Sequence, residues 1–166
     1  MRRTTAISAA LASLLLTASG CRREVPIEPP SMRYGESICV ECGMAISDER
    51  YAAAMLVRAP GDEIEALRFD DIGCMVDYEL DKDALDVLRR YVHDHDTRAW
   101  LDAEQAVYLR AASLHTPMAS GLAAFRDRAA ADAAAARWPG ETLGFATIAG
   151  TIAVPPPDLP RRAPAH

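Results

Sequence analysis

Three absences narrow the fold and function classes open to this 166-residue sequence. No repeat with a period of about 20 to 50 residues recurs, which excludes a solenoid. No apolar run reaches the roughly 18 residues that a membrane-spanning helix needs. Basic residues are outnumbered, 18 against 24 acidic ones, so the chain lacks the basic surface expected of a nucleic-acid-binding protein. Half of the residues are apolar, which is enough for one packed core.

The N-terminus has the order of a bacterial export signal. Arg2 and Arg3 precede a short apolar run at residues 6–16, which is followed by small residues and Cys21. This ending resembles a lipobox, in which the cysteine is lipidated and becomes the mature N-terminus. We therefore expect a signal peptide at residues 1–20 and an exported protein, lipid-anchored through Cys21 to a bacterial membrane and facing the periplasm. The alternative is an ordinary signal peptide with an incidental cysteine.

Cleavage at that point would make the chain more acidic. It removes two arginines and no acid, which leaves 16 basic against 24 acidic residues and a formal charge of −8. This charge argues against nucleic acid as a partner and favours attraction to cationic species. Proline-rich segments predict a flexible tether at residues 21–35 and a disordered tail at 151–166. The domain itself is expected at residues 36–150.

The first half of this domain has the pattern of a strand-strand-helix-strand unit. Apolar runs at residues 51–58 and 63–69 flank a Pro-Gly-Asp turn, which predicts a hairpin. Asp70 or Asp71 can then cap a helix. Residues 85–93 alternate between apolar and polar in their second part and predict a strand.

The second half repeats the order. A strand is expected around residues 106–109, followed by a helix that begins at Thr116-Pro117 and ends at the Trp-Pro-Gly sequence of residues 138–140. Residues 142–148 predict a last strand. The fold class expected is therefore α+β, two small strand-strand-helix-strand units with mixed or antiparallel sheet.

The Cys-Val-Glu-Cys-Gly-Met sequence at residues 39–44 carries the chemistry. With Cys21 lipidated, an odd number of thiols remains, so at least one does not form an intrachain disulfide. The spacing fits a zinc knuckle, but no second Cys-x-x-Cys and no His-x-x-x-His supplies the other ligands. It also fits a redox dithiol, although no strand precedes it and no clear helix follows. A third interpretation is a site for Cu(I), which thiolate and thioether donors select.

Methionines and histidines near polar turns are the further candidate ligands. Met44 follows Cys42 by two residues, and Met118 lies in a polar Thr-Pro turn where a core methionine is less expected. His93 and His95 flank an acid at a strand end and could each supply a nitrogen, although such histidines more often have structural roles.

Several motifs in fixed order resemble the NosL family, the accessory lipoproteins of nitrous oxide reductase. They are Cys21, the Cys-Gly-Met motif, Phe-Asp-Asp-Ile-Gly-Cys-Met at 69–75, Trp-Leu-Asp-Ala at 100–103 and Thr-Pro-Met at 116–118. The resemblance implies two treble-clef-like halves related to the organomercurial lyase core. It also implies a non-enzymatic, membrane-anchored Cu(I) chaperone, which acts with an ABC-type maturation complex to supply the copper–sulfide centre of nitrous oxide reductase.

The resemblance ranks the ligands. It places Cys42 first as thiolate and Met118 as thioether, then Met44, with Cys39, His95 and His93 as further candidates. Cys74 lies on an apolar helix face, which favours a buried structural thiol. The alternatives that remain are a thiol-disulfide oxidoreductase, a structural zinc domain and an enzyme of organomercurial-lyase type.

Overall fold

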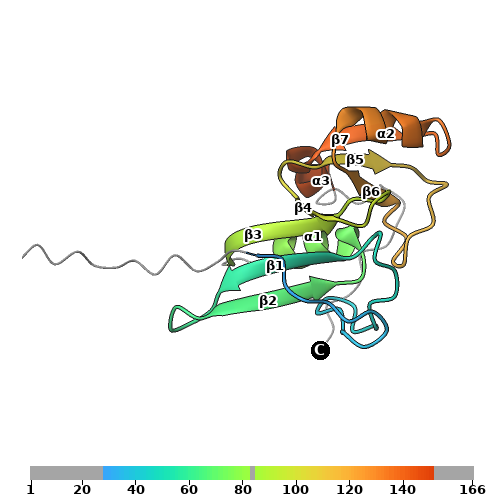
Figure 1. The fold of residues 1–166 in the computed structure, drawn as a ribbon. Helices are drawn as coiled ribbons and strands as arrows, with labels where there is room; N and C mark the ends of the chain where they lie inside the picture. Colours follow the sequence, from blue (N-terminus) through green and yellow to red (C-terminus); the bar gives the residue numbers. More distant parts are fainter. Residues whose placement is uncertain (1–27, 83–84, 152–166) are drawn as a thin grey trace, which may run out of the picture.

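The computed structural model describes residues 28–82 and 85–151 and has the predicted α+β fold. The strands form two antiparallel sheets (Figure 1). The expected signal peptide, Cys21 and nearly all of the proline-rich tail lie outside the described residues. Within the described part, no helix combines the length and apolar character needed to cross a membrane.

The first sheet and its helix confirm the first predicted unit. The elements are β1 (Ala53–Arg58), β2 (Ile64–Phe69), α1 (Ile72–Leu80), β3 (Asp86–His93) and β4 (Trp100–Asp102). The strand order is β2-β1-β3-β4. The turn between β1 and β2 is closed by the Ala59 amide, which donates to the Glu63 carbonyl at 2.8 Å, and Gly61 supplies its positive φ of 89°.

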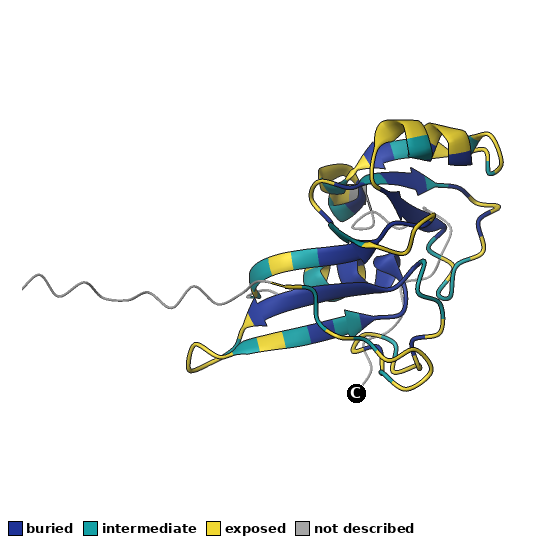
Figure 2. Ribbon diagram, in the orientation of Figure 1, coloured by how far each residue is buried: buried dark blue, intermediate teal, exposed yellow. Residues whose placement is uncertain are grey.

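β1 is one of the two inner strands of this sheet and is buried along most of its length (Figure 2). Its alternating side chains enter different clusters because successive residues of a strand face opposite sides. Met55 and Val57 pack with Ile72 and Met75 of α1 in the main core cluster. The other face of the sheet is covered by a smaller cluster around Leu56. The sheet therefore holds α1 against one face.

The second unit follows the same order around a three-stranded sheet. Its elements are β5 (Val107–Arg110), β6 (Leu122–Phe125), α2 (Arg128–Ala135), β7 (Glu141–Gly144) and α3 (Phe145–Thr151). The strand order is β6-β5-β7. The two units meet where β3 ends, because the His95 amide donates to the Ala124 carbonyl at 2.8 Å. Both sheets contribute to the main core cluster.

The helix predicted from Thr116 begins too early. Residues Leu122–Phe125 form β6, and α2 begins only after Asp127, whose carboxylate accepts from the Ala130 amide at 2.8 Å. Leu122 and Phe125 suggested helical spacing because all four residues of β6 are buried. The side chains of β6 instead alternate between the main core cluster and a second cluster, which is the period of a strand.

The last predicted strand is correct only in its first part. β7 ends at Gly144, and Phe145 opens α3. Ile148 is buried in the main core cluster, and the ring of Phe145 lies 6.3 Å from that of Tyr108. A helical turn brings both apolar side chains onto the core face, because residues three apart share a face of a helix.

Candidate metal centre

Three thiols gather at one end of the first unit. The sulfurs of Cys39, Cys42 and Cys74 all lie within 4.8 Å of one another. Among the described residues this is the one group of three or more His, Cys, Asp or Glu side chains close enough to hold a metal ion. Cys39 and Cys74 are buried, whereas Cys42 is partly exposed. The cluster is thus closed toward the core and open on the side of Cys42.

A small hairpin at residues 37–46, which we call the knuckle, supplies two of these thiols. The Cys39 amide donates to the Met44 carbonyl at 2.8 Å, and the Gly43 amide donates back to the Cys39 carbonyl at 2.9 Å. Gly43 has a φ of 74°, a conformation that glycine adopts without strain. The Val40 amide donates to the Arg68 carbonyl of β2 at 3.0 Å, which fixes the knuckle to the first sheet.

The third thiol comes from the first turn of α1. Asp71 is the N-cap, and its Oδ1 accepts from the Gly73 amide at 2.8 Å. Cys74 follows at the third helical position, where the sequence predicted a buried structural thiol. It is buried, at 5% exposure, but it faces the knuckle thiols. Sequence reasoning missed this partner, although the Asp-Ile-Gly-Cys order already placed the thiol in the first turn of a helix.

The cluster favours one thiolate. The pKa of the Cys39 thiol is lowered to about 5, chiefly because the Cys74 thiol donates a hydrogen bond to its sulfur; burial opposes this shift, and backbone amides of Cys42, Asp70 and Glu41 reinforce it. The hydrogen bond to Cys39 and burial together raise the pKa of Cys74. Burial also raises the pKa of Cys42. A soft anionic donor is therefore present at neutral pH before any metal binds.

We expect the reduced, metal-free protein to keep one thiolate per chain at neutral pH and to lose it as the pH falls through about 5. The direction follows because a lowered pKa leaves the thiol deprotonated at every pH above it. Ultraviolet thiolate absorbance during an acid titration measures this. Cys39→Ser should abolish the acidic transition. If the first thiol of the unsubstituted protein titrates only near the ordinary value of 9.0, the expectation fails.

Met118 lies in a turn fastened to α1. Oδ2 of the fully buried Asp71 accepts from the Thr116 hydroxyl at 2.6 Å and from the Met118 amide at 3.0 Å. The helix start predicted at Thr116 is therefore wrong: the segment is a turn, closed by the Ala119 amide on the Thr116 carbonyl at 3.0 Å. Met118 packs against the same core cluster as Cys42. Asp71 thus joins the Met118 turn to the helix that carries Cys74.

Gly73 shows how closely this turn approaches α1. A Cβ at Gly73 would lie 2.6 Å from the Cβ of Ser120, which is too short for two carbons. Glycine at this position is therefore required by packing between α1 and the Met118 turn.

Met44, the other predicted thioether ligand, lies on the outside of the knuckle with 56% of its surface exposed.

The two predicted histidine ligands lie in other environments. His93 is buried, its Nε2 is 2.8 Å from the Tyr34 hydroxyl and its Nδ1 is 2.7 Å from the Arg98 carbonyl. Both ring nitrogens are thus engaged, and its ring stacks on Trp100 at 3.7 Å. Burial lowers its pKa, so it is held neutral.

His95 packs among aromatic rings. Its ring centroid lies 5.5 Å from Phe125, 5.5 Å from Trp138 and 5.8 Å from Tyr51. Its Nε2 is buried without a hydrogen-bond partner. His93 and His95 therefore stay predictions as ligands, and the structure does not group either with the thiols.

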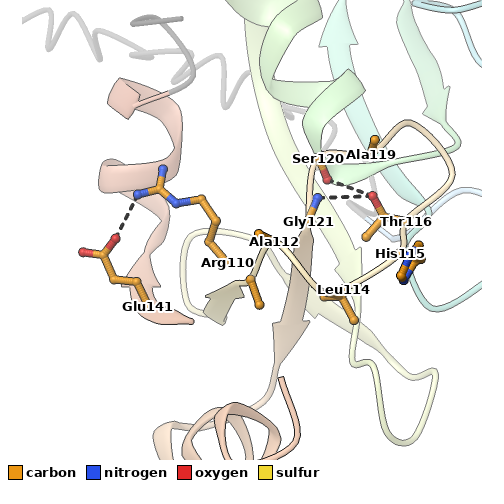
Figure 3. Close-up of a pocket in the computed structure, with 10 residues that line it drawn as sticks. Arg110, Ala112, Leu114, His115, Thr116, Ala119, Ser120, Gly121 and Glu141 are labelled. Atoms are coloured by element: carbon orange, nitrogen blue, oxygen red, sulfur yellow. Dashed lines mark hydrogen bonds and ion pairs between the residues drawn. The ribbon is translucent and has the colours of Figure 1, made fainter. Parts of the chain in front are cut away.

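An open pocket of about 550 Å³ flanks the Met118 turn (Figure 3). Thr116, Ser120 and His115 line one part of it, and the ion pair between Arg110 and Glu141, at 2.8 Å, lines another. No thiol lines this pocket. It is therefore separate from the thiol cluster.

Comparisons with known proteins agree with this architecture. The model of the family described as NosL matches residues 32–153. The crystal structure of the copper chaperone NosL from Shewanella denitrificans is similar in fold, with a TM-score of 0.64 at 18% sequence identity. The match covers 74% of this chain and 96% of that chain. A comparison with curated proteins gives no match.

Proposed function

The chain belongs to the NosL family, and we propose that it is a copper chaperone, not an enzyme, which holds Cu(I) and hands it to an acceptor. One observation carries the proposal: three thiols from the knuckle and α1 lie within 4.8 Å of one another, and only Cys42 of the three is partly exposed. The solved relative with this fold is itself named a copper chaperone.

The donor chemistry suits Cu(I). Thiolates and thioethers are soft ligands that favour Cu(I) over hard or borderline cations. We assign Cys39, Cys42 and Cys74 as the thiol ligands. We assign Met118 as the thioether ligand because its turn is fastened to α1, which carries Cys74, and because it packs against the core cluster that contains Cys39 and Cys74. Met44 is exposed on the outside of the knuckle. Its thioether is therefore accessible to copper that enters or leaves the site.

The acceptor and the location are extensions of the same proposal. The family resemblance suggests nitrous oxide reductase and its ABC-type maturation complex as the destination of the copper. A lipid anchor at Cys21 would keep the chaperone at the periplasmic face of a membrane, where such a complex is reached by short-range diffusion.

The affinity for copper should also depend on pH. Binding of a metal by thiolates displaces protons, so acidification favours release of the metal.

A structural zinc site is the second candidate. Two thiols from a knuckle and one from the first turn of a helix make three ligands of a tetrahedral zinc site. A fourth strong ligand is what such a closed site needs, and the described residues offer no His, Asp or Glu in the group. The three-thiol set with one partly exposed member therefore favours an exchangeable soft metal.

An anaerobic competition titration separates the two candidates. The reduced soluble protein, starting at residue 22, is titrated with Cu(I) against a Cu(I)-specific chelator, and with Zn(II) in parallel. We expect one Cu(I) per chain, bound far more tightly than Zn(II). Preferential zinc binding would instead assign a structural knuckle, and binding of neither metal would favour a redox dithiol.

A further inference from the structure

Exposed apolar side chains are concentrated around the knuckle. Five large apolar residues are exposed in the described part of the chain, and four of them lie within 11 residues of each other: Tyr34, Ile38, Val40 and Met44. Single exposed apolar residues are ordinary on a protein surface. A concentration in one short segment marks a surface that another molecule covers.

The apolar side chains point outward for a structural reason. Cys39 is 1% exposed, while its neighbours Ile38 and Val40 are 55% and 43% exposed, because the knuckle is a hairpin whose successive side chains face opposite sides. The inward position goes to the thiol ligand. Exposed apolar residues at the outward positions contribute little to the core, and polar residues would solvate better there.

Cys42, the partly exposed thiol, lies between the exposed Val40 and Met44 in the turn of the knuckle. Cys39 and Cys74 are buried, so an incoming ligand reaches the metal from the side of Cys42. In the exchange, a lone pair of the acceptor's thiolate, thioether or imidazole forms a bond to Cu(I) as the bond from Cys42 breaks. Copper keeps its oxidation state, and when the incoming group is a thiol its proton passes to Cys42.

Acidic residues border the apolar surface on one side. Glu41, in the turn of the knuckle, interacts electrostatically with Asp77 and Asp81 of the end of α1. All three are exposed, and Lys82 offsets part of their charge at Glu41. A second copy of this chain would bring like charges together across the contact, and an anionic lipid surface would be repelled. A partner with basic residues beside an apolar face is complementary.

We propose that the outer face of the knuckle, formed by Ile38, Val40 and Met44 and bordered by Glu41, is the surface on which a copper-accepting protein docks. The acceptor's contact face is apolar, carries lysine or arginine at one edge and presents a soft ligand to the Cys42 side of the cluster. This inference rests on the proposed chaperone function and adds to it the surface and the kind of partner.

The test compares two acceptors for the same protein. The Ile38→Ser/Val40→Ser double variant is loaded with Cu(I) and mixed either with the copper-free ABC-type maturation complex or with a small Cu(I) chelator. We expect transfer to the complex to slow at least about tenfold, with unchanged transfer to the chelator and unchanged Cu(I) affinity. Neither residue is a proposed ligand, so the chelator arm controls for damage to the metal site.

A second experiment tests the contribution of charge with two glutamate variants. Glu41→Gln should slow transfer to the complex at low salt, and the difference should shrink at high salt because screening removes exposed charge interactions. Glu65→Gln, an exposed glutamate on β2, should have no effect.

Other outcomes overturn the inference. Equal transfer by the double variant and the unsubstituted protein would show that the knuckle is not the docking surface. If the unsubstituted protein binds Cu(I) but does not pass it to the complex, the chosen partner is wrong while the chaperone chemistry stands. A dimer in sedimentation that the double variant dissolves would assign the surface to a second copy of the chain, and binding to zwitterionic vesicles that the variant loses would assign it to lipid.

Discussion

Replacing Cys39 with serine is expected to weaken Cu(I) binding by more than about 100-fold, beyond the loss typical of residues that only support a ligand. Cys39 is the thiolate of the cluster, stabilised by the Cys74 thiol and by backbone amides. Serine offers a neutral, hard oxygen in the same buried position, which Cu(I) does not favour. An anaerobic chelator competition titration measures the affinity, and circular dichroism checks that the variant folds.

Cys21→Ser is the matched control for this substitution. It makes the same chemical change at a cysteine outside the knuckle and α1. In a soluble, unlipidated protein that retains residue 21, it should leave Cu(I) binding unchanged. If Cys39→Ser binds Cu(I) as tightly as the unsubstituted protein, Cys39 is not a ligand. The ligand set would then be reduced to Cys42, Cys74 and the methionines.

The elements that could be predicted have local signals. The β1-β2 hairpin follows from a Pro-Gly-Asp turn between two apolar runs, and α1 follows from the cap at Asp71. Each signal depends on only a few neighbouring residues, so it can be identified from one sequence without knowledge of the tertiary contacts. The Cys-x-x-Cys-Gly spacing is evident for the same reason, since its cysteines and Gly43 are close in the chain, but the hairpin that this segment forms was not predicted.

The position of Cys74 could not be predicted in this way. An apolar helix face shows that its thiol is buried, and burial is confirmed. Which side of the first turn of α1 faces the knuckle depends on the direction in which the chain leaves β2 and enters the helix. Cys39 and Cys74, which meet there, are 35 positions apart in the chain. The hydrogen bond from the Cys74 thiol to Cys39 is thus a property of the fold.

The error at β6 has a different cause. A strand whose residues are buried on both faces shows no alternation in the sequence, so Leu122–Phe125 merged with the alanine-rich helix that follows. That error also placed Met118 inside a helix. The structure places it in a turn held by Asp71, which makes the carboxylate a positioning residue for the proposed thioether.

Asp71→Asn is expected to lower Cu(I) affinity about 10- to 100-fold without touching a proposed ligand. One oxygen of Asp71 caps α1, and the other accepts from the Thr116 hydroxyl and the Met118 amide. An asparagine can still cap the helix with its carbonyl, but its amide group then faces the Met118 N–H, donor against donor. The buried mismatch costs about 1–3 kcal/mol, and the Met118 turn is released from α1.

Asp127→Asn provides the matched control. Asp127 is likewise an N-cap, of α2, and its carboxylate accepts from the Ala130 amide at 2.8 Å, but it is exposed and lies far along the chain from the thiols. This substitution should leave Cu(I) affinity unchanged. Thermal unfolding of both variants separates a loss of affinity from a general loss of stability.

A double-mutant cycle decides whether Asp71 acts through Met118. Met118→Leu alone should weaken Cu(I) binding, whereas Met75→Leu, at a methionine buried in the core, should not. If Asp71 positions the thioether, Asp71→Asn has little further effect on affinity once Met118 is leucine, because the group it holds no longer binds copper. Additive losses would instead mean that Asp71 supports the thiols through the first turn of α1, and that the Met118 turn is fastened to the helix for stability alone.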